Sequence, residues 1–325
     1  MFPAFLVLGL AIAYLLLLFA VALFAERAWA AGATWVRHPV VYGLALGTYF
    51  TSWGYFTSGA ALFTEGLGDL YLNLGASLTF LVGWPLILKV IRIAKQQRVT
   101  TVPEMLTLRY GSSFMLSLLV SLLLVLGTLY YVALQLAVIS RATRDLILGP
   151  TSTPMPVSGP MSLELALVLA AFAILFGARR ADTSQGNVGL TAVLAMDALV
   201  SLLTLLPLAL MVCLAFPGLF QGQMTWPSLQ IGSTTNSYPI AMTYLLIGGS
   251  AILLLPRMFQ VTVVECTSET QLRLARWFFP LQMLLLTVAV VLVAWVGASL
   301  GFSDRQLQGA AFILPFMAGL PAMAL

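Results

Sequence analysis

The chain has 325 residues, of which 61% are hydrophobic and 8% are charged, and its mean hydropathy is +1.01. Because a soluble domain carries about 25% charged residues, there are too few charges here to cover a water-facing surface. A soluble enzyme, a peripheral protein and a disordered chain are therefore excluded. The long unbroken apolar runs differ from the short alternating strands of a membrane barrel, so the composition predicts an all-α membrane protein.

Eight apolar stretches are long enough to be transmembrane helices, each of which needs about 20 apolar residues. They lie at 3–24, 41–64, 71–93, 114–139, 162–178, 188–216, 238–260 and 277–300. A ninth stretch, 307–325, contains Pro315 and Pro321, and it is expected to form a surface helix or a re-entrant segment. Since no linker separates the spans, residues 1–325 are expected to form a single transmembrane domain, with no soluble domain.

The positive charges predict the orientation. With the N-terminus outside, twelve of the 15 Lys and Arg residues fall in cytoplasmic segments, Arg257 among them. The three on the outside are Arg141, Arg144 and Arg305. An excess of Lys and Arg in cytoplasmic loops is the rule for helical membrane proteins, so this count predicts an outside N-terminus. The same distribution places the bases in loops between apolar runs, which argues against nucleic-acid binding.

The second span, 41–64, is rich in small and hydroxyl residues. Between Tyr42 and Gly59 it has four glycines, and hydroxyl groups crowd its centre at Thr48, Tyr49, Thr51, Ser52 and Tyr55. Hydroxyl groups can satisfy backbone groups that are freed where a helix unwinds, and an unwound backbone offers carbonyl ligands for Na⁺. Tight helix packing alone is the competing interpretation, because small residues also allow close approach.

The seventh span, 238–260, has a matching feature. Gly248, Gly249 and Ser250 are expected to interrupt it near its middle, and Pro256 follows. Two glycine-interrupted spans in corresponding positions indicate a transporter site near the middle of the membrane. The two spans are five apart, which fits a five-plus-five inverted repeat.

Three further polar residues lie within predicted spans. Asp197 is an acid well inside the sixth span, where it is either part of an ion path or a paired structural acid. Tyr131 and Gln135 are four residues apart and share a helix face, where they either line a solute path or form an interhelical hydrogen bond. With two cysteines and one histidine in the whole chain, no catalytic motif or metal site other than one for Na⁺ is predicted, so the chain is not expected to be an enzyme.

Several segments carry a family resemblance. Arg92 to Gly111 and Gly189 to Asp197 resemble motifs of the sodium:solute symporters, although Met196 and Val200 stand where that family has threonine and glutamine. Three more segments resemble the symporter-like N-terminal membrane domain of certain bacterial sensor histidine kinases. They are Phe176 to Asp182, Leu255 to Glu265 and Ala275 to Pro280.

The resemblance implies a LeuT-type fold that stops after about eight helices, so that the second repeat is incomplete. It implies a location in the bacterial inner membrane and Na⁺ as the coupling ion, with no other cofactor. By position, Na⁺ would be held by backbone carbonyls near Gly47 and Phe50, with Asp197 as a further ion-binding residue. The family's hydroxyl ligands come from a span that would follow Leu325, so this Na⁺ site is expected to be incomplete in the chain.

Two functions follow as expectations. The first is sodium-coupled uptake of a small organic solute, an amino acid being the first choice, by alternating access. The alternative is a solute-sensing input domain whose kinase core lies beyond this chain, with that core or a response regulator as a partner. A structural subunit of a larger membrane assembly is a third possibility. The solute is expected to contact nine residues: Tyr49, Thr51, Ser52, Trp53, Tyr131, Gln135, Gly248, Gly249 and Ser250.

Overall fold

The computed structural model describes residues 2–64, 66–148, 187–216 and 238–319, together with 163, 166, 167, 170 and 171. Within these ranges the chain is helical and contains no strand, as predicted. The predicted fifth span, 162–178, residues 217–237 and the segment Phe176 to Asp182 lie wholly or largely outside the described residues.

Four of the described helices are long and apolar enough to cross a membrane. They are α1 (Ala4–Ala30), α8 (Phe114–Leu148), α10 (Val188–Ala215) and α13 (Glu269–Ser299). Two bent helix pairs raise this number to as many as six if each pair is one span. Membrane-type helices are thus confirmed, whereas the LeuT-type arrangement stays a prediction.

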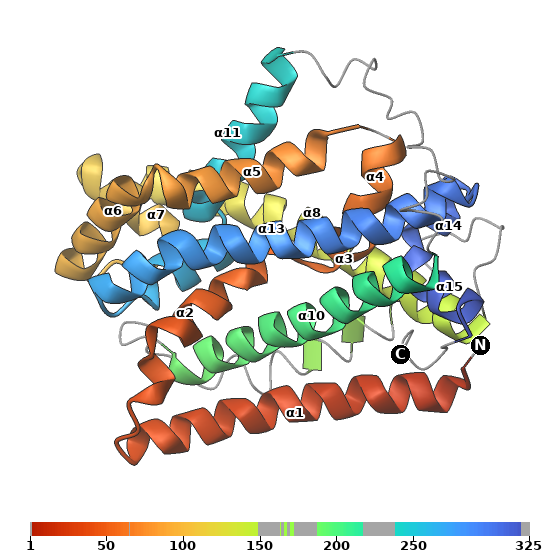
Figure 1. Ribbon diagram of the computed structural model, residues 1–325. Coiled ribbons are helices and arrows are strands. Elements are labelled where there is room, and N and C mark those ends of the chain that lie inside the picture. The colour runs from red at the N-terminus through yellow and green to blue at the C-terminus, as the bar shows by residue number, and fades with distance from the viewer. Residues whose placement is uncertain are drawn as a thin grey trace.

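Helix α13 runs through the middle of the molecule (Figure 1). It begins with a capping box between Ser268 and Gln271, and its buried face carries Phe279, Met283 and Leu286. Around it pack α10, α5 (Gly68–Leu81), α2 (Pro39–Ala45) and α4 (Ser58–Thr64), and α1 packs on the far side of α10. The core of the protein is therefore built around α13.

The third predicted span, 71–93, is not one straight helix. Helix α5 ends at Leu81, α6 (Trp84–Gln97) begins at Trp84, and the two are bent by 69°. Pro85 lies in the first turn of α6, and Gly83 precedes that helix. A proline cannot continue a helix but starts one readily, which explains the bend. Helix α7 (Val102–Arg109) follows α6.

The predicted ninth stretch forms two short helices, α14 (Asp304–Gln308) and α15 (Ala310–Met317). Neither is long enough to be a complete span, and residues 320–325 lie outside the described part. Leu314 of α15 is fully buried, and α15 packs against α13 and α10. The segment is therefore packed into the core rather than spread on the surface.

Candidate functional site

The second span is broken, as its composition predicts. Helix α2 ends at Ala45, a 3₁₀ turn covers Leu46–Tyr49, and Phe50 and Thr51 are extended, with ψ angles of 115° and −178°. Helix α3 (Ser52–Phe56) then begins at Ser52. The break frees backbone carbonyl groups in the interior of the molecule, where they need partners.

Two of these carbonyls bind an arginine from the seventh span. The guanidinium of Arg257 donates a hydrogen bond of 2.7 Å to the carbonyl oxygen of Thr48 and one of 3.4 Å to that of Tyr49. The same group lies 4.9 Å from the centre of the Tyr131 ring, at cation–π distance. Arg257 therefore joins the break in the second span to α8.

Helix α8 contributes a second polar contact to the break. The Gln135 amide donates to the Thr51 hydroxyl at 3.2 Å, and the Ser52 hydroxyl donates to the amide oxygen of Gln135. Five of the nine predicted solute-contacting residues therefore meet here: Tyr49, Thr51, Ser52, Tyr131 and Gln135. With Arg257 they form what we call the break cluster.

The seventh span is also broken, but not where its glycines predicted. Helix α11 (Tyr238–Leu254) continues without interruption through Gly248, Gly249 and Ser250. The chain bends by 57° at Leu255, and α12 (Pro256–Phe259) follows, continued by a π-helical turn at Gln260–Val264. The predicted interruption at 248–250 is thus wrong, because Pro256 and not the glycine pair ends the helix.

The three residues at 248–250 have other surroundings. A Cβ on Gly248 would lie 2.1 Å from the carbonyl oxygen of Leu72, and one on Gly249 would lie 2.6 Å from the hydroxyl of Thr79. Ser250 is exposed and donates to the carbonyl of Ile247 in its own helix. The glycines therefore permit close packing of α11 on α5 and lie outside the break cluster, as does Ser250.

Trp53 also lies outside the break cluster. Its indole N–H donates to the Asp69 carboxylate at 3.1 Å, and the Ser58 hydroxyl donates to the same oxygen at 2.8 Å. These bonds join α3 and α4 to the first turn of α5. The contact ties the short helices after the break to the rest of the bundle.

Gly47, one of the two predicted Na⁺ ligands, lies in a crowded place. Its carbonyl accepts from the Phe50 backbone N–H at 2.9 Å, and a Cβ at Gly47 would overlap the amide of Gln282 on α13. Gln282 is only 2% exposed, and neither its amide nitrogen nor its amide oxygen has a hydrogen-bond partner among the described residues. The sequence did not predict this buried amide. A glutamine within an apolar span does not indicate which groups it will contact in the fold.

Asp197 is paired with a tyrosine of the first span. The hydroxyl of Tyr14 on α1 donates to the Asp197 carboxylate at 2.7 Å. Of the two interpretations drawn from the sequence, this contact matches the paired acid. The next residue in the chain, Ala198, lies against Gly47. Asp197 is therefore a sequence neighbour of a residue that contacts the predicted Na⁺ region.

Arg257 is the residue that the sequence interpretation placed wrongly. The charge count assigned it to a cytoplasmic segment. In the structure its guanidinium is partly buried between the two breaks and Tyr131, and its Nε is buried without a partner among the described residues. One sequence feature could have indicated this position of Arg257. It directly follows Pro256, and a proline is a common place for a helix to end.

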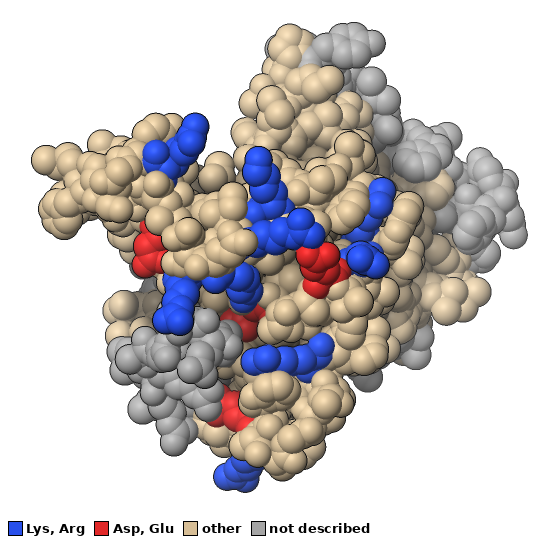
Figure 2. Space-filling model, turned by 90° about the vertical axis from the view of Figure 1, so that its left-hand side faces the viewer, with Lys and Arg blue, Asp and Glu red and all other residues tan. Residues whose placement is uncertain are grey.

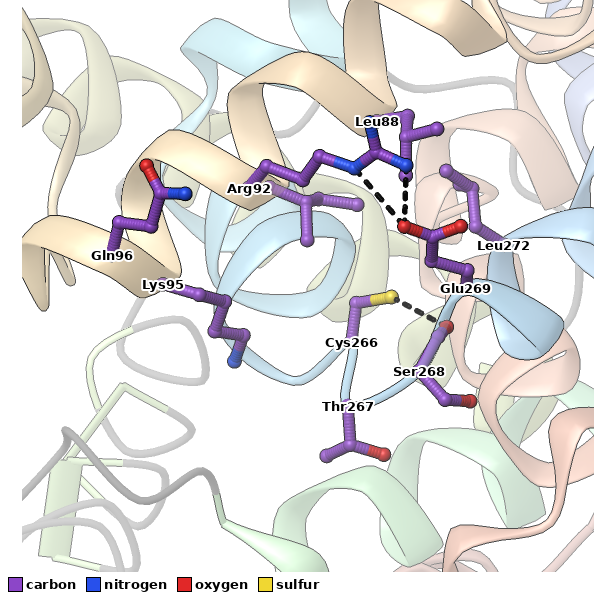
Figure 3. A pocket seen from close by; sticks show the side chains of 10 residues that line it. Leu88, Arg92, Lys95, Gln96, Cys266, Thr267, Ser268, Glu269 and Leu272 are labelled. Carbon is purple, nitrogen blue, oxygen red and sulfur yellow. Dashed lines mark hydrogen bonds and ion pairs between the residues drawn. The ribbon is translucent and has the colours of Figure 1, made fainter.

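A separate pocket of about 280 Å³ lies at the charged end of the molecule, between α6 and the start of α13. Figure 2 shows this end, where Lys and Arg side chains gather with few acids among them. Figure 3 shows Arg92 of α6 reaching to Glu269, an ion pair of 2.6 Å, and the Cys266 thiol turned toward the carbonyl of Ser268. Lys95 donates to the carbonyl of Val264 at 2.5 Å, so the pocket wall ties α6 to the end of the seventh span.

Burial raises the pKa of the Cys266 thiol above its usual range. The thiolate is the reactive form, so maleimide should label Cys266 at pH 7.4 about 10-fold or more slowly in the folded protein than after unfolding in SDS. The Cys213→Ala variant isolates this thiol. Equal rates in the folded and unfolded protein would show that the charged end opens freely.

The described residues contain no group of three His, Cys, Asp or Glu side chains that could hold a metal ion. This does not test a Na⁺ site made of carbonyl groups. The comparisons with protein families, with curated proteins and with solved structures find no match.

Proposed function

We propose that the protein is a sodium:solute symporter-like membrane domain that binds a small organic solute at the break cluster. The observation that carries the proposal is the meeting of two broken spans at Arg257, which also lies over the ring of Tyr131, one turn before Gln135 on α8. Broken helices that face each other inside the membrane are the usual construction of solute sites in secondary transporters. The family resemblance of the sequence points to the same function.

The proposal includes coupling to Na⁺ and alternating access. Backbone carbonyls at the break, near Gly47 and Phe50, are hard oxygen ligands suited to Na⁺, and the unpartnered Gln282 amide, whose nitrogen lies beside Gly47, carries a further oxygen. A LeuT-type five-plus-five arrangement in the bacterial inner membrane, with the N-terminus outside, belongs to the same proposal. An amino acid is the first solute to try.

Uptake into proteoliposomes tests this proposal. Radiolabelled amino acids and small organic acids are offered with an inward sodium gradient or with choline in its place. We expect accumulation of at least one solute with sodium and none with choline. Uptake that is the same in both would contradict sodium coupling, and binding without any uptake would favour the sensor.

The Gln135→Ala variant should lower uptake about 10-fold or more, because it removes both hydrogen bonds to Thr51 and Ser52 at the break. Ser250→Ala is the matched control, since among the described residues the Ser250 hydroxyl bonds to a carbonyl of its own helix. The proposal predicts normal uptake for this control. An equal loss in both variants would place the solute elsewhere.

The second candidate is a solute-sensing input domain of a membrane sensor kinase. Met196 and Val200 favour it, since they stand where the symporters have threonine and glutamine. Such a domain would bind solute at the same cluster without carrying it across the membrane. A solute-dependent thermal shift with no uptake under either gradient is the result that this candidate predicts.

A further inference from the structure

Arg257 carries a positive charge that nothing in the described part of the chain neutralises. No Asp or Glu oxygen of the described residues lies within 4.0 Å of it. Its partners are two backbone carbonyls and the ring of Tyr131, all of them neutral groups. Its Nε is buried and has no partner among the residues described. The guanidinium has five N–H donors, so donors remain for a further group.

An uncompensated charge inside a membrane protein is costly. Charged side chains within transmembrane segments face the bundle interior or a water-filled cavity, where they pair with one another or mark a ligand path. Carbonyl dipoles lower the cost at Arg257 without cancelling the charge. Hydrogen bonds to two neutral carbonyls require N–H donors but not a net charge, so holding the break together does not by itself explain the positive charge.

We propose that Arg257 recognises the carboxylate of the solute. This inference rests on the proposed function, because it names the substrate class of the same cluster. The planar guanidinium matches the two oxygens of a carboxylate, and a single fixed charge suits a monocarboxylate better than a dianion. Gln135, Thr51 and Ser52 hydrogen-bond to one another one helical turn from Tyr131, and their amide and hydroxyl groups would bind the remainder of the solute. The class includes amino acids, whose carboxylate would lie at Arg257.

A comparison of each acid with its amide tests whether binding requires the negative charge of the carboxylate. Acetate, lactate, pyruvate and the common L-amino acids are each compared with the corresponding primary amide. The measurement is the melting temperature of the purified full chain, followed by tryptophan fluorescence. We expect at least one acid to raise the melting temperature by about 2–4 °C at saturation, and its amide to leave the temperature unchanged.

Variants of Arg257 then test whether this residue is the one that recognises the carboxylate. Arg257→Gln should weaken binding of that acid by about 10- to 100-fold, and Arg257→Lys should weaken it less, because lysine keeps the charge but loses the planar fork. Arg276→Gln is the matched control. Arg276 also donates to a backbone carbonyl, that of Leu81 at 3.1 Å, and also lies 5.3 Å from an aromatic ring, that of Trp84. Its replacement should leave binding unchanged.

The outcomes separate the two proposals. If an acid and its amide raise the melting temperature equally, carboxylate recognition is wrong while solute binding stands. If no acid has an effect, carboxylate recognition is also overturned, and sodium-dependent uptake of a neutral solute decides the proposed function separately. If an acid binds equally well to the wild type and Arg257→Gln, the anion is held elsewhere.

Discussion

Replacement of Gly248 by alanine is expected to destabilise the protein by about 3 kcal/mol, because α11 and α5 meet there backbone to backbone. A Cβ at Gly248 would lie 2.1 Å from the carbonyl oxygen of Leu72, and one at Gly75 would lie 2.1 Å from that of Leu245. Backbone atoms inside a helix cannot move aside as a flexible side chain can. The free energy of unfolding in mixed micelles, measured by titration with SDS, gives the size of the effect.

Gly127→Ala provides the control for this experiment. Gly127 lies within α8, and a Cβ there meets no atom of the described residues within 4 Å. Alanine is the better helix former, so this variant should be more stable than the wild type by about 0.5–1 kcal/mol. Equal effects at Gly248 and Gly127 would show that the close approach of α11 to α5 does not exist.

Replacement of Glu265 by alanine is expected to cost about 3–5 kcal/mol, because its carboxylate is buried and satisfies several donors at once. Glu265 is 6% exposed and accepts from the backbone N–H of Asn187 at 2.8 Å, from the Thr191 hydroxyl at 3.2 Å and from the Gln260 amide at 2.8 Å. Asn187 and Thr191 belong to the start of α10, which carries free N–H groups and partial positive charge. The alanine variant would leave the partly buried Asn187 N–H and Gln260 amide without this acceptor, while the Thr191 hydroxyl keeps its bond to the carbonyl of Asn187.

Glu269→Gln is the matched comparison for Glu265. Glu269 lies four residues later and forms an ion pair with Arg92, but both side chains are about half exposed, at 48% and 59%. Exposed ion pairs contribute about 0–1 kcal/mol, so this variant should unfold at nearly the wild-type SDS concentration. A loss at Glu265 no larger than the loss at Glu269 would mean that the carboxylate does not cap α10.

The sequence predicted the break in the second span and failed to locate the break in the seventh. The second span has hydroxyl residues around Phe50, and these can satisfy freed backbone groups, so composition and unwinding agree there. In the seventh span the glycine pair was compatible either with an unwound helix or with close approach of a second helix. Which of the two occurs depends on the helix that packs against the pair. That neighbour, α5, cannot be identified from the local sequence.

The position of Arg257 could not be read from the charge pattern. Counting Lys and Arg on either side of the membrane treats every base near a span end as a loop residue. Arg257 follows the bend at Leu255, and the bend turns it back toward Thr48 and Tyr49, more than 200 residues earlier in the chain. Tyr131 and Gln135 were predicted correctly as neighbours because they share a face of one helix, which the spacing alone establishes.

Solute is proposed to bind where the break in the second span meets Gln135 and Arg257. A cysteine-free background, Cys213→Ala with Cys266→Ala, receives Ser52→Cys in one variant and Ser250→Cys in another. The rate of labelling by a methanethiosulfonate reagent is measured with and without the solute that the uptake or thermal-shift screen identifies. We expect solute to slow labelling at position 52 about 10-fold or more and to leave labelling at position 250 unchanged. Protection at position 250 and none at position 52 would contradict it.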